Sequence, residues 1–192
     1  MTETFLIVGL GNPGREYREN RHNTGFMLVD RLAVKLNARF SRLQSKALVA
    51  SATYRERKLI LAKPQTFMNL SGQAVQGLLH FYKLPLANLL VAHDDIDLPL
   101  GTIRIRPDGG SAGQKGMASV LERLGTDEFP RLRLGIGRPP GQMQAPDYVL
   151  QDFSDAELKI MSAILEDAAE AVLTFVAEGL DAAMNKYNRL PA

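Results

Sequence analysis

The chain has 192 residues, of which 45% are hydrophobic and 23% are charged. These proportions fit one globular domain spanning residues 1–192, and they exclude a disordered or fibrous protein. The 23 Lys and Arg residues nearly balance the 21 Asp and Glu residues, so an anionic partner would have to meet a local basic patch. Cysteine is absent, which excludes disulfide bonds, thiol nucleophiles and cysteine metal sites. Because no long apolar stretch indicates a membrane span or a signal peptide, we expect a cytoplasmic protein.

Short apolar runs alternate with longer periodic segments along the chain. We expect six strands of a mixed sheet, each bounded by Gly, Pro or charged residues, over 5–10, 47–53, 58–62, 89–93, 102–106 and 131–136. Helical spacing of apolar residues predicts covering helices over 26–36 and 75–82. Ser154 and Glu157 form a capping-box pattern at the start of the longest helix, which ends near Gly179 and is followed by a short helix over 181–187. The Pro-rich segment 138–146 is expected to be a mobile loop that borders the site.

His22 is the most informative single residue. It lies in the polar stretch 21–25, shortly after a glycine-rich turn over 9–14 that closes the first predicted strand. Open α/β sheets bind ligands at the carboxyl ends of their strands, so a loop histidine at this place indicates an active site.

The glycine-rich turn over 9–14 also satisfies the dinucleotide-binding fingerprint, and Asp30 follows about twenty residues further on. That fingerprint needs a helix directly behind the turn, whereas 15–23 is polar and lacks an apolar stripe. We therefore favour a tight strand exit, in which the glycines permit the backbone path and Asn12 is free to take a catalytic role.

A histidine and three carboxylates, His93, Asp94, Asp95 and Asp97, follow the predicted strand 89–93. They do not have an established metal-ligand spacing. One carboxylate could instead orient a histidine from another loop and stabilise its protonated form, or all three could cap a turn. Asp94, nearest the strand end, is our candidate for the partner of His22.

Asn69 follows another strand exit, in the segment 63–72 just before a predicted helix. Its side chain could cap that helix, or its amide could hold a carbonyl, an oxyanion or a water molecule. The sequence leaves both roles open.

Five segments taken in order closely resemble the bacterial peptidyl-tRNA hydrolase family: 5–14 with Tyr17, 21–25, 64–72, 91–101 and 131–137. The resemblance covers nearly the whole chain. It implies a single α/β domain, a twisted mixed β-sheet flanked by helices on both faces, without a cofactor or metal. The implied activity is hydrolysis of the ester that joins a peptide to the terminal ribose of a tRNA. Peptidyl-tRNA is then the partner, with no DNA and no membrane, and we expect a monomer.

The same resemblance assigns roles to residues. It implies that His22 is the catalytic base and Asp94 its partner, with His22 deprotonating a water that attacks the ester carbonyl. Asn12 and Asn69 match positions that contact the peptide end of the substrate, and Tyr17 flanks the tRNA end. Phe67 belongs to the same substrate-binding set.

Two arginine pairs supply the positive charge that RNA binding needs. Arg104 and Arg106 lie on one face of a predicted strand, and Arg106 and Arg133 match the family's clamp for the tRNA terminal phosphate. A solvated strand face is the alternative interpretation for Arg104 and Arg106.

One segment departs from the family. Where the family usually has Gly-His-Asn-Gly, this chain has Gly113-Gln114-Lys115-Gly116. An ammonium group only donates hydrogen bonds, so Lys115 cannot replace an amide that also accepts them. Lys115 could meet a phosphate or the nascent-chain carbonyl, or the loop 108–116 could take another conformation. A noncatalytic RNA-binding relative is the alternative function, and the presence of His22 and Asp94 argues against it.

Overall fold

A seven-stranded mixed sheet forms the centre of the structure, a computed structural model that describes residues 2–188. The strand order is β2-β3-β4-β1-β5-β7-β6, with β4, β1, β5 and β7 parallel and the remaining pairings antiparallel. The strands are β1 (Thr4–Gly9), β2 (Arg42–Gln44), β3 (Ala47–Tyr54), β4 (Arg57–Pro64), β5 (Leu89–Asp95), β6 (Ile103–Arg106) and β7 (Arg131–Gly135). The four parallel strands therefore end at one edge of the sheet.

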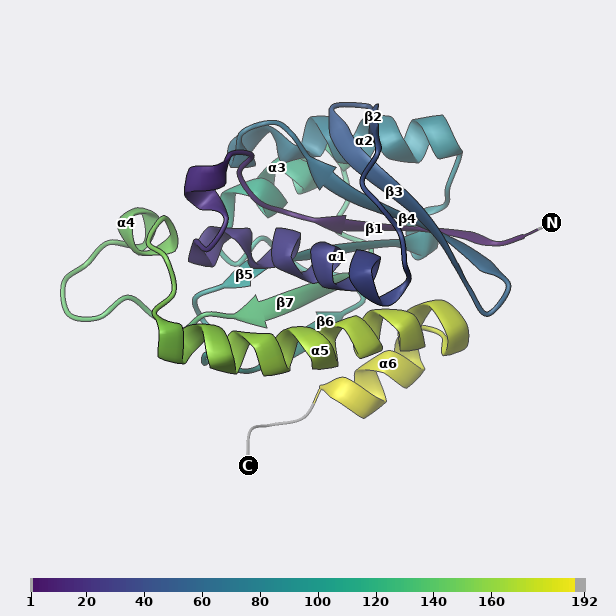
Figure 1. The fold of residues 1–192 in the computed structure, drawn as a ribbon. Helices are drawn as coiled ribbons and strands as arrows, with labels where there is room; N and C mark the ends of the chain where they lie inside the picture. The colour runs from purple at the N-terminus through teal and green to yellow at the C-terminus, as the bar shows by residue number, and fades with distance from the viewer. Residues whose placement is uncertain (1, 189–192) are drawn as a thin grey trace.

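Helices cover both faces of this sheet, with α1, α5 and α6 on one side and α2 and α3 on the other (Figure 1). They are α1 (Thr24–Lys35), α2 (Ser71–Tyr82), α3 (Lys115–Leu124), α4 (Ala145–Val149), α5 (Asp155–Glu178) and α6 (Leu180–Tyr187). Strand alternation divides the core between the two faces, because Phe5 and Ile7 of β1 pack with α1 and α5, whereas Leu6 and Val8 pack with α2 and α3. The predicted fold class is confirmed.

All six predicted strands are present, and so is the capping box at α5, where the Ser154 side chain accepts a hydrogen bond from the Glu157 backbone. Besides the short 3₁₀ turns, one strand and two α-helices were not predicted: the edge strand β2, the helix α3, and the helix α4, which begins at the end of the expected loop 138–146. A β2 strand of three residues is too short to show a period. The helix α3 is more consequential, because its N-terminus lies beside the candidate site.

Tight glycine contacts place His22 over the ends of β1 and β5. A Cβ atom on Gly25, in the first turn of α1, would lie 2.5 Å from the Leu10 nitrogen and 2.5 Å from the Ala92 oxygen. Only glycine lets α1 approach the two strands so closely. Two 3₁₀ turns, Arg15–Tyr17 and Arg21–Asn23, lie between the glycine-rich turn and α1. The helix that a dinucleotide site needs directly behind the turn is therefore replaced by these 3₁₀ turns, as expected.

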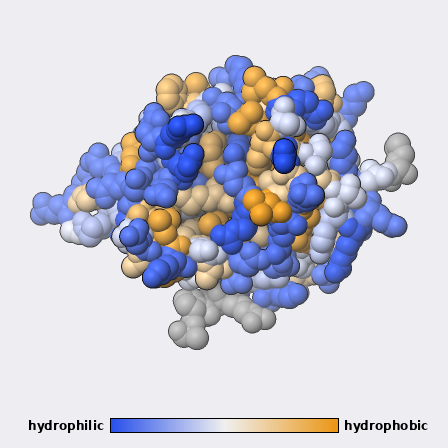
Figure 2. All heavy atoms as spheres, viewed as in Figure 1, coloured by the Kyte–Doolittle hydropathy of each residue, from blue (hydrophilic) through white to orange (hydrophobic). Residues whose placement is uncertain are grey.

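The visible surface is mostly polar. Figure 2 shows hydrophilic residues over most of one face, with apolar residues in small groups between them. Within residues 2–188, no helix is both long enough and apolar enough to cross a membrane.

Candidate active site

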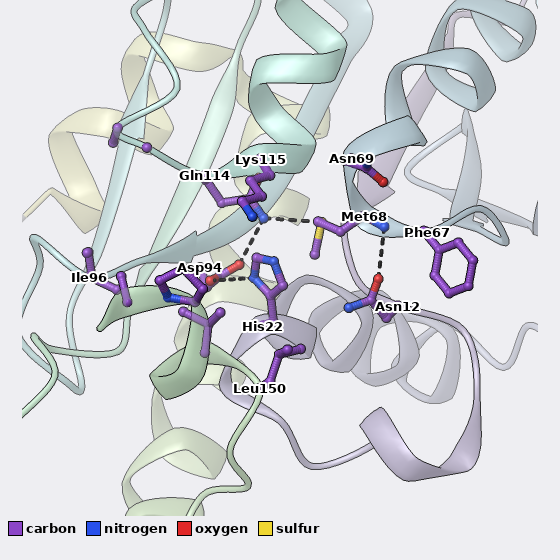
Figure 3. A pocket seen from close by; sticks show the side chains of 15 residues that line it. Asn12, His22, Phe67, Met68, Asn69, Asp94, Ile96, Gln114, Lys115 and Leu150 are labelled. Carbon is purple, nitrogen blue, oxygen red and sulfur yellow. Dashed lines mark hydrogen bonds and ion pairs between the residues drawn. The ribbon is translucent and has the colours of Figure 1, made fainter. Parts of the chain in front are cut away.

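A cavity of about 490 Å³ lies at the carboxyl ends of β1, β4 and β5. Its walls come from the loops after these strands, the N-terminus of α3, and α4 with the residue that follows it. The ring of His22 forms part of its wall, between Asp94 and Gln114 on one side and Asn12 and Phe67 on the other (Figure 3). A cavity of this size accommodates a small ligand group, such as the end of a larger substrate.

His22 and Asp94 form a buried pair. The Nδ1 atom of His22 lies 2.9 Å from Oδ2 of Asp94, and the two residues are 7% and 2% exposed. Burial by itself would raise the pKa of the Asp94 carboxyl, but the attraction that a protonated His22 exerts and the hydrogen bonds from His22 and Gln114 hold this pKa below its usual value. An ionised carboxylate only accepts hydrogen bonds, so Nδ1 carries the proton. The other ring nitrogen, Nε2, is then free to accept one.

Gln114 donates a hydrogen bond to the second oxygen of the Asp94 carboxylate. Its Nε2 atom lies 3.0 Å from Oδ1 of Asp94, and its Oε1 atom accepts a hydrogen bond from the Met117 backbone at the start of α3. No role for Gln114 was predicted from the sequence. The signal that was missed is the helical spacing of Met117, Val120 and Leu124, which predicts a helix beginning just after it.

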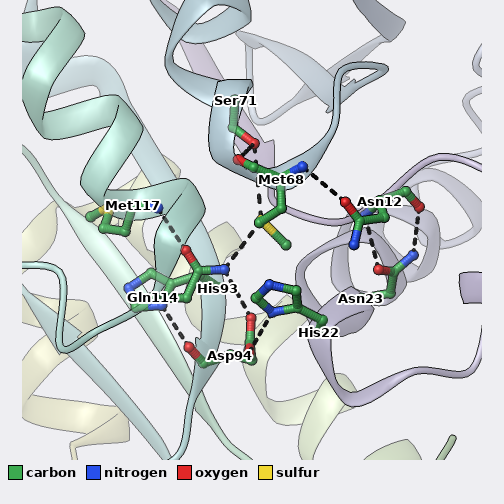
Figure 4. Close-up of polar contacts among 9 residues, drawn as sticks. All are labelled: Asn12, His22, Asn23, Met68, Ser71, His93, Asp94, Gln114 and Met117. Carbon is green, nitrogen blue, oxygen red and sulfur yellow. Dashed lines mark hydrogen bonds and ion pairs between the residues drawn. The ribbon is translucent and has the colours of Figure 1, made fainter. Parts of the chain in front are cut away.

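The side chain of Asn12 has a fixed orientation at the opposite wall. Its Oδ1 atom accepts a hydrogen bond from the Met68 backbone at 2.8 Å. The Asn23 side chain holds the Asn12 backbone, accepting from its N–H and donating to its C=O, both at 2.9 Å. These contacts turn the Asn12 amide nitrogen toward His22 (Figures 3 and 4). Asn12 therefore presents a hydrogen-bond donor to the cavity.

Asn69 and Phe67 come from the loop after β4. Asn69 lies in the 3₁₀ turn Met68–Leu70 and is exposed in the cavity wall. Leu70 precedes α2 and no side chain caps that helix, so the N-cap interpretation of Asn69 is wrong. Phe67 is 65% exposed, which leaves its ring available to a ligand.

The acidic cluster after β5 divides into separate contacts. Asp95 accepts a hydrogen bond from the Asp97 backbone and so supports the turn, as the capping interpretation expected for this residue, while Asp97 pairs with Arg138. His93 is fully buried and its Nδ1 atom contacts the Asp94 carbonyl at 2.8 Å; burial lowers the pKa of its imidazole. Among residues 2–188, no three His, Asp or Glu side chains are grouped so that they could hold a metal ion.

The arginine pairs lie on one face of β6 and β7, outside the cavity. Arg106 is exposed, while Arg133 is half-buried and lies 3.6 Å from Asp95. Arg131 is fully buried, where it donates to the carbonyls of residues 109, 110, 127 and 129. The sequence segment 131–133 suggested Arg131 as a further positive group for RNA binding; that suggestion is wrong, because the Arg131 guanidinium is buried and hydrogen-bonded to backbone carbonyls. Tyr17 also lies outside the cavity, half-buried in the first 3₁₀ turn.

Comparison with known proteins identifies the family. A family model described as peptidyl-tRNA hydrolase matches residues 6–192. The chain belongs to the peptidyl-tRNA hydrolase family. The peptidyl-tRNA hydrolase of Carboxydothermus hydrogenoformans is 50% identical to it, over 96% of this chain and 98% of that protein. The peptidyl-tRNA hydrolase of Chloroflexus aggregans is 49% identical, over 97% of this chain and 100% of that protein. The crystal structure of peptidyl-tRNA hydrolase from Acinetobacter baumannii has a TM-score of 0.90 at 33% identity, covering 97% of this chain and 95% of that one.

Gln114 and Lys115 stand at the two adjacent positions where the resemblance predicted a His and an Asn. Lys115 is the first residue of α3, and its exposed side chain lines the cavity. Gln114, the residue before it, points inward and is 6% exposed. The two residues therefore have different surroundings: Lys115 places a positive charge at the cavity wall, and Gln114 is a hydrogen-bond partner of Asp94.

One wall of the cavity is held by Arg21, the neighbour of His22. Its guanidinium makes two hydrogen bonds with Glu157, at 3.0 and 3.1 Å, and lies 4.2 Å from the centre of the Tyr148 ring in α4. It also donates to the carbonyls of Gln151 and Asp152. Arg21 thus connects the loop of His22 to the segment that contains α4.

Proposed function

We propose that this chain hydrolyses the ester bond between peptide and tRNA in peptidyl-tRNA, releasing tRNA for reuse in translation, with His22 as the general base. The observation that carries the proposal is the buried pair of His22 and Asp94, 2.9 Å apart, at the wall of a cavity. Membership of the peptidyl-tRNA hydrolase family supports the choice of substrate.

The mechanism follows from the two nitrogens of His22. Asp94 holds the proton on Nδ1, so Nε2 takes a proton from a water molecule as its oxygen attacks the ester carbonyl. The attack forms a tetrahedral oxyanion, and the imidazolium is stabilised by the Asp94 carboxylate. When the intermediate collapses, the ester bond to the ribose oxygen breaks and the imidazolium returns a proton to that oxygen. The reaction needs no covalent intermediate with the protein.

Substrate binding is divided between the cavity and the surface beside it. The Asn12 amide nitrogen is placed to donate to the carbonyl or the oxyanion, and Asn69 and Phe67 contact the peptide end. Arg106 and Arg133 bind the terminal phosphate of the tRNA, and Tyr17 flanks the tRNA end. The ammonium of Lys115 binds a phosphate or a carbonyl of the nascent chain, since it only donates hydrogen bonds.

We also propose that the chain acts as a monomer in the cytoplasm. All the residues that this mechanism uses come from one chain, which supports a monomeric enzyme.

The test compares two substrates that differ at one amino group. Single-turnover hydrolysis of N-acetyl-aminoacyl-tRNA should be fast, and hydrolysis of the unblocked aminoacyl-tRNA should be slow, because a blocked amine mimics a peptide. Equal rates on both substrates would contradict the assignment of peptidyl-tRNA as substrate. Tight binding of tRNA without hydrolysis of either substrate would favour a noncatalytic RNA-binding protein.

A further inference from the structure

The side chain of Gln114 connects the catalytic pair to the start of α3 and to Met68. This side chain is 6% exposed and reaches the Met117 backbone nitrogen, the Asp94 carboxylate and the Met68 sulfur (Figure 4). We propose that Gln114 is a positioning residue that fixes Asp94 as a hydrogen-bond acceptor toward His22. This inference rests on the proposed function, in which His22 is the general base.

The helix α3 determines which way the Gln114 amide faces. The Met117 N–H in the first turn of α3 needs an acceptor from outside the helix, and Gln114 Oε1 supplies it at 2.6 Å. The amide nitrogen then has to lie on the other side, where it donates to Asp94 Oδ1 at 3.0 Å and lies 3.3 Å from the Met68 sulfur. A flipped amide would set its nitrogen against the Met117 N–H and its oxygen against the carboxylate. The orientation is therefore set by both partners together.

The fixed amide in turn restricts Asp94. Its Oδ1 accepts from Gln114 and its Oδ2 accepts from His22, so both carboxylate oxygens have a partner and the carboxylate plane is held. This arrangement leaves only an acceptor facing His22 Nδ1. The ring consequently keeps its proton on Nδ1 and its lone pair on Nε2, which is the form that a general base requires.

Substitutions at Asp94 and Gln114 that exchange the hydrogen-bond donor and acceptor test this arrangement. In Asp94→Asn, the Gln114 donor selects the oxygen of the introduced amide, so its NH₂ group faces His22 and forces the proton onto Nε2. Loss of the base should lower kcat by about 10²- to 10⁴-fold. In the double variant Asp94→Asn with Gln114→Glu, the introduced carboxylate accepts from the NH₂ group and still caps α3. The amide oxygen then faces His22 again, and kcat should rise at least about 10-fold above that of Asp94→Asn alone.

The matched control separates helix capping from positioning. Gln114→Ser keeps a favoured N-cap residue, but its short side chain does not reach Asp94. We expect kcat on N-acetyl-aminoacyl-tRNA to fall by about 10- to 100-fold, which is the usual effect of losing a hydrogen bond to a charged group. KM and the melting temperature should change little, because Gln114 is only 6% exposed and the exposed residues of the cavity wall and the helix cap are kept.

The outcomes distinguish this inference from the function on which it rests. Recovery in the double variant, together with a loss of kcat in Gln114→Ser, supports the positioning role. A double variant no more active than Asp94→Asn, or a wild-type kcat for Gln114→Ser, overturns it. His22→Ala is measured beside them: if that variant is inactive while the Gln114 results fail, only the positioning role is wrong. If His22→Ala keeps full activity, the general base and the positioning role are both wrong.

Discussion

Replacing Arg21 by alanine should destabilise the protein and loosen one wall of the cavity. The Arg21 side chain is only 8% exposed and makes paired hydrogen bonds with Glu157, whose side chain is 25% exposed. It also lies over the Tyr148 ring at 4.2 Å, and Tyr148 belongs to α4, which lines the cavity. Arg21→Ala removes all these contacts at once and leaves the carboxylate of Glu157 without its guanidinium partner.

The size of the effect follows from these contacts. Breaking a buried ion pair by removing one partner costs about 3 to 5 kcal/mol, and the partial exposure of Glu157 places this pair at the lower end. The contact with the Tyr148 ring adds about 1 kcal/mol. We therefore expect the free energy of unfolding to fall by about 3 to 4 kcal/mol.

The assay is urea unfolding at pH 7, with Arg18→Ala as the matched control because Arg18 is an exposed arginine from the same loop. The control should change the free energy of unfolding by less than about 0.5 kcal/mol. For Arg21→Ala, KM for N-acetyl-aminoacyl-tRNA should rise more than kcat falls, since α4 is displaced while the His22 and Asp94 pair is kept. A decrease in stability below about 1 kcal/mol for Arg21→Ala would refute the reasoning.

Three further predictions concern other parts of the molecule. Burial lowers the pKa of His93, so below about pH 6.5 the unfolded chain binds a proton at this residue that the folded chain does not. The free energy of unfolding therefore falls by up to about 1.4 kcal/mol for each pH unit below that point. In urea titrations between pH 7 and pH 5, His93→Asn should reduce this dependence of stability on pH. Gly25→Ala, whose Cβ would lie 2.5 Å from backbone atoms, should lower the free energy of unfolding by about 3 kcal/mol, whereas Gly110→Ala, with nothing within 4 Å, should leave the thermal melt unchanged. Arg106→Ala should reduce the slope of log(kcat/KM) against log salt concentration by about one on a full-length tRNA substrate, and an unchanged slope would remove Arg106 from the phosphate site.

Much of the fold could be predicted from local patterns. The run before the glycine-rich turn is apolar because β1 is buried on both faces, and the capping box at Ser154 satisfies backbone groups within one helical turn. Such signals depend on neighbouring residues in the chain. The placement of His22 and Asp94 could be inferred in the same way, because both follow predicted strands whose ends share one edge of the sheet.

The contacts that depend on distant segments could not be predicted. Arg131 has the same sequence pattern as an arginine on a solvated strand, and only the loop that folds over it turns its guanidinium inward. The contacts of Gln114 could not be predicted because they require both the start of α3 and a carboxylate twenty residues earlier. The N-cap interpretation of Asn69 failed because a 3₁₀ turn delays the start of α2 to Ser71.

The central claim is that His22, held by Asp94, is the general base of ester hydrolysis. It is tested most directly by the single-turnover rate of His22→Ala on N-acetyl-aminoacyl-tRNA, measured at pH 7 beside the unsubstituted protein. We expect this rate to fall by about 10²- to 10⁴-fold, because the attacking water loses its proton acceptor. A rate within a few-fold of that of the unsubstituted protein would contradict the claim.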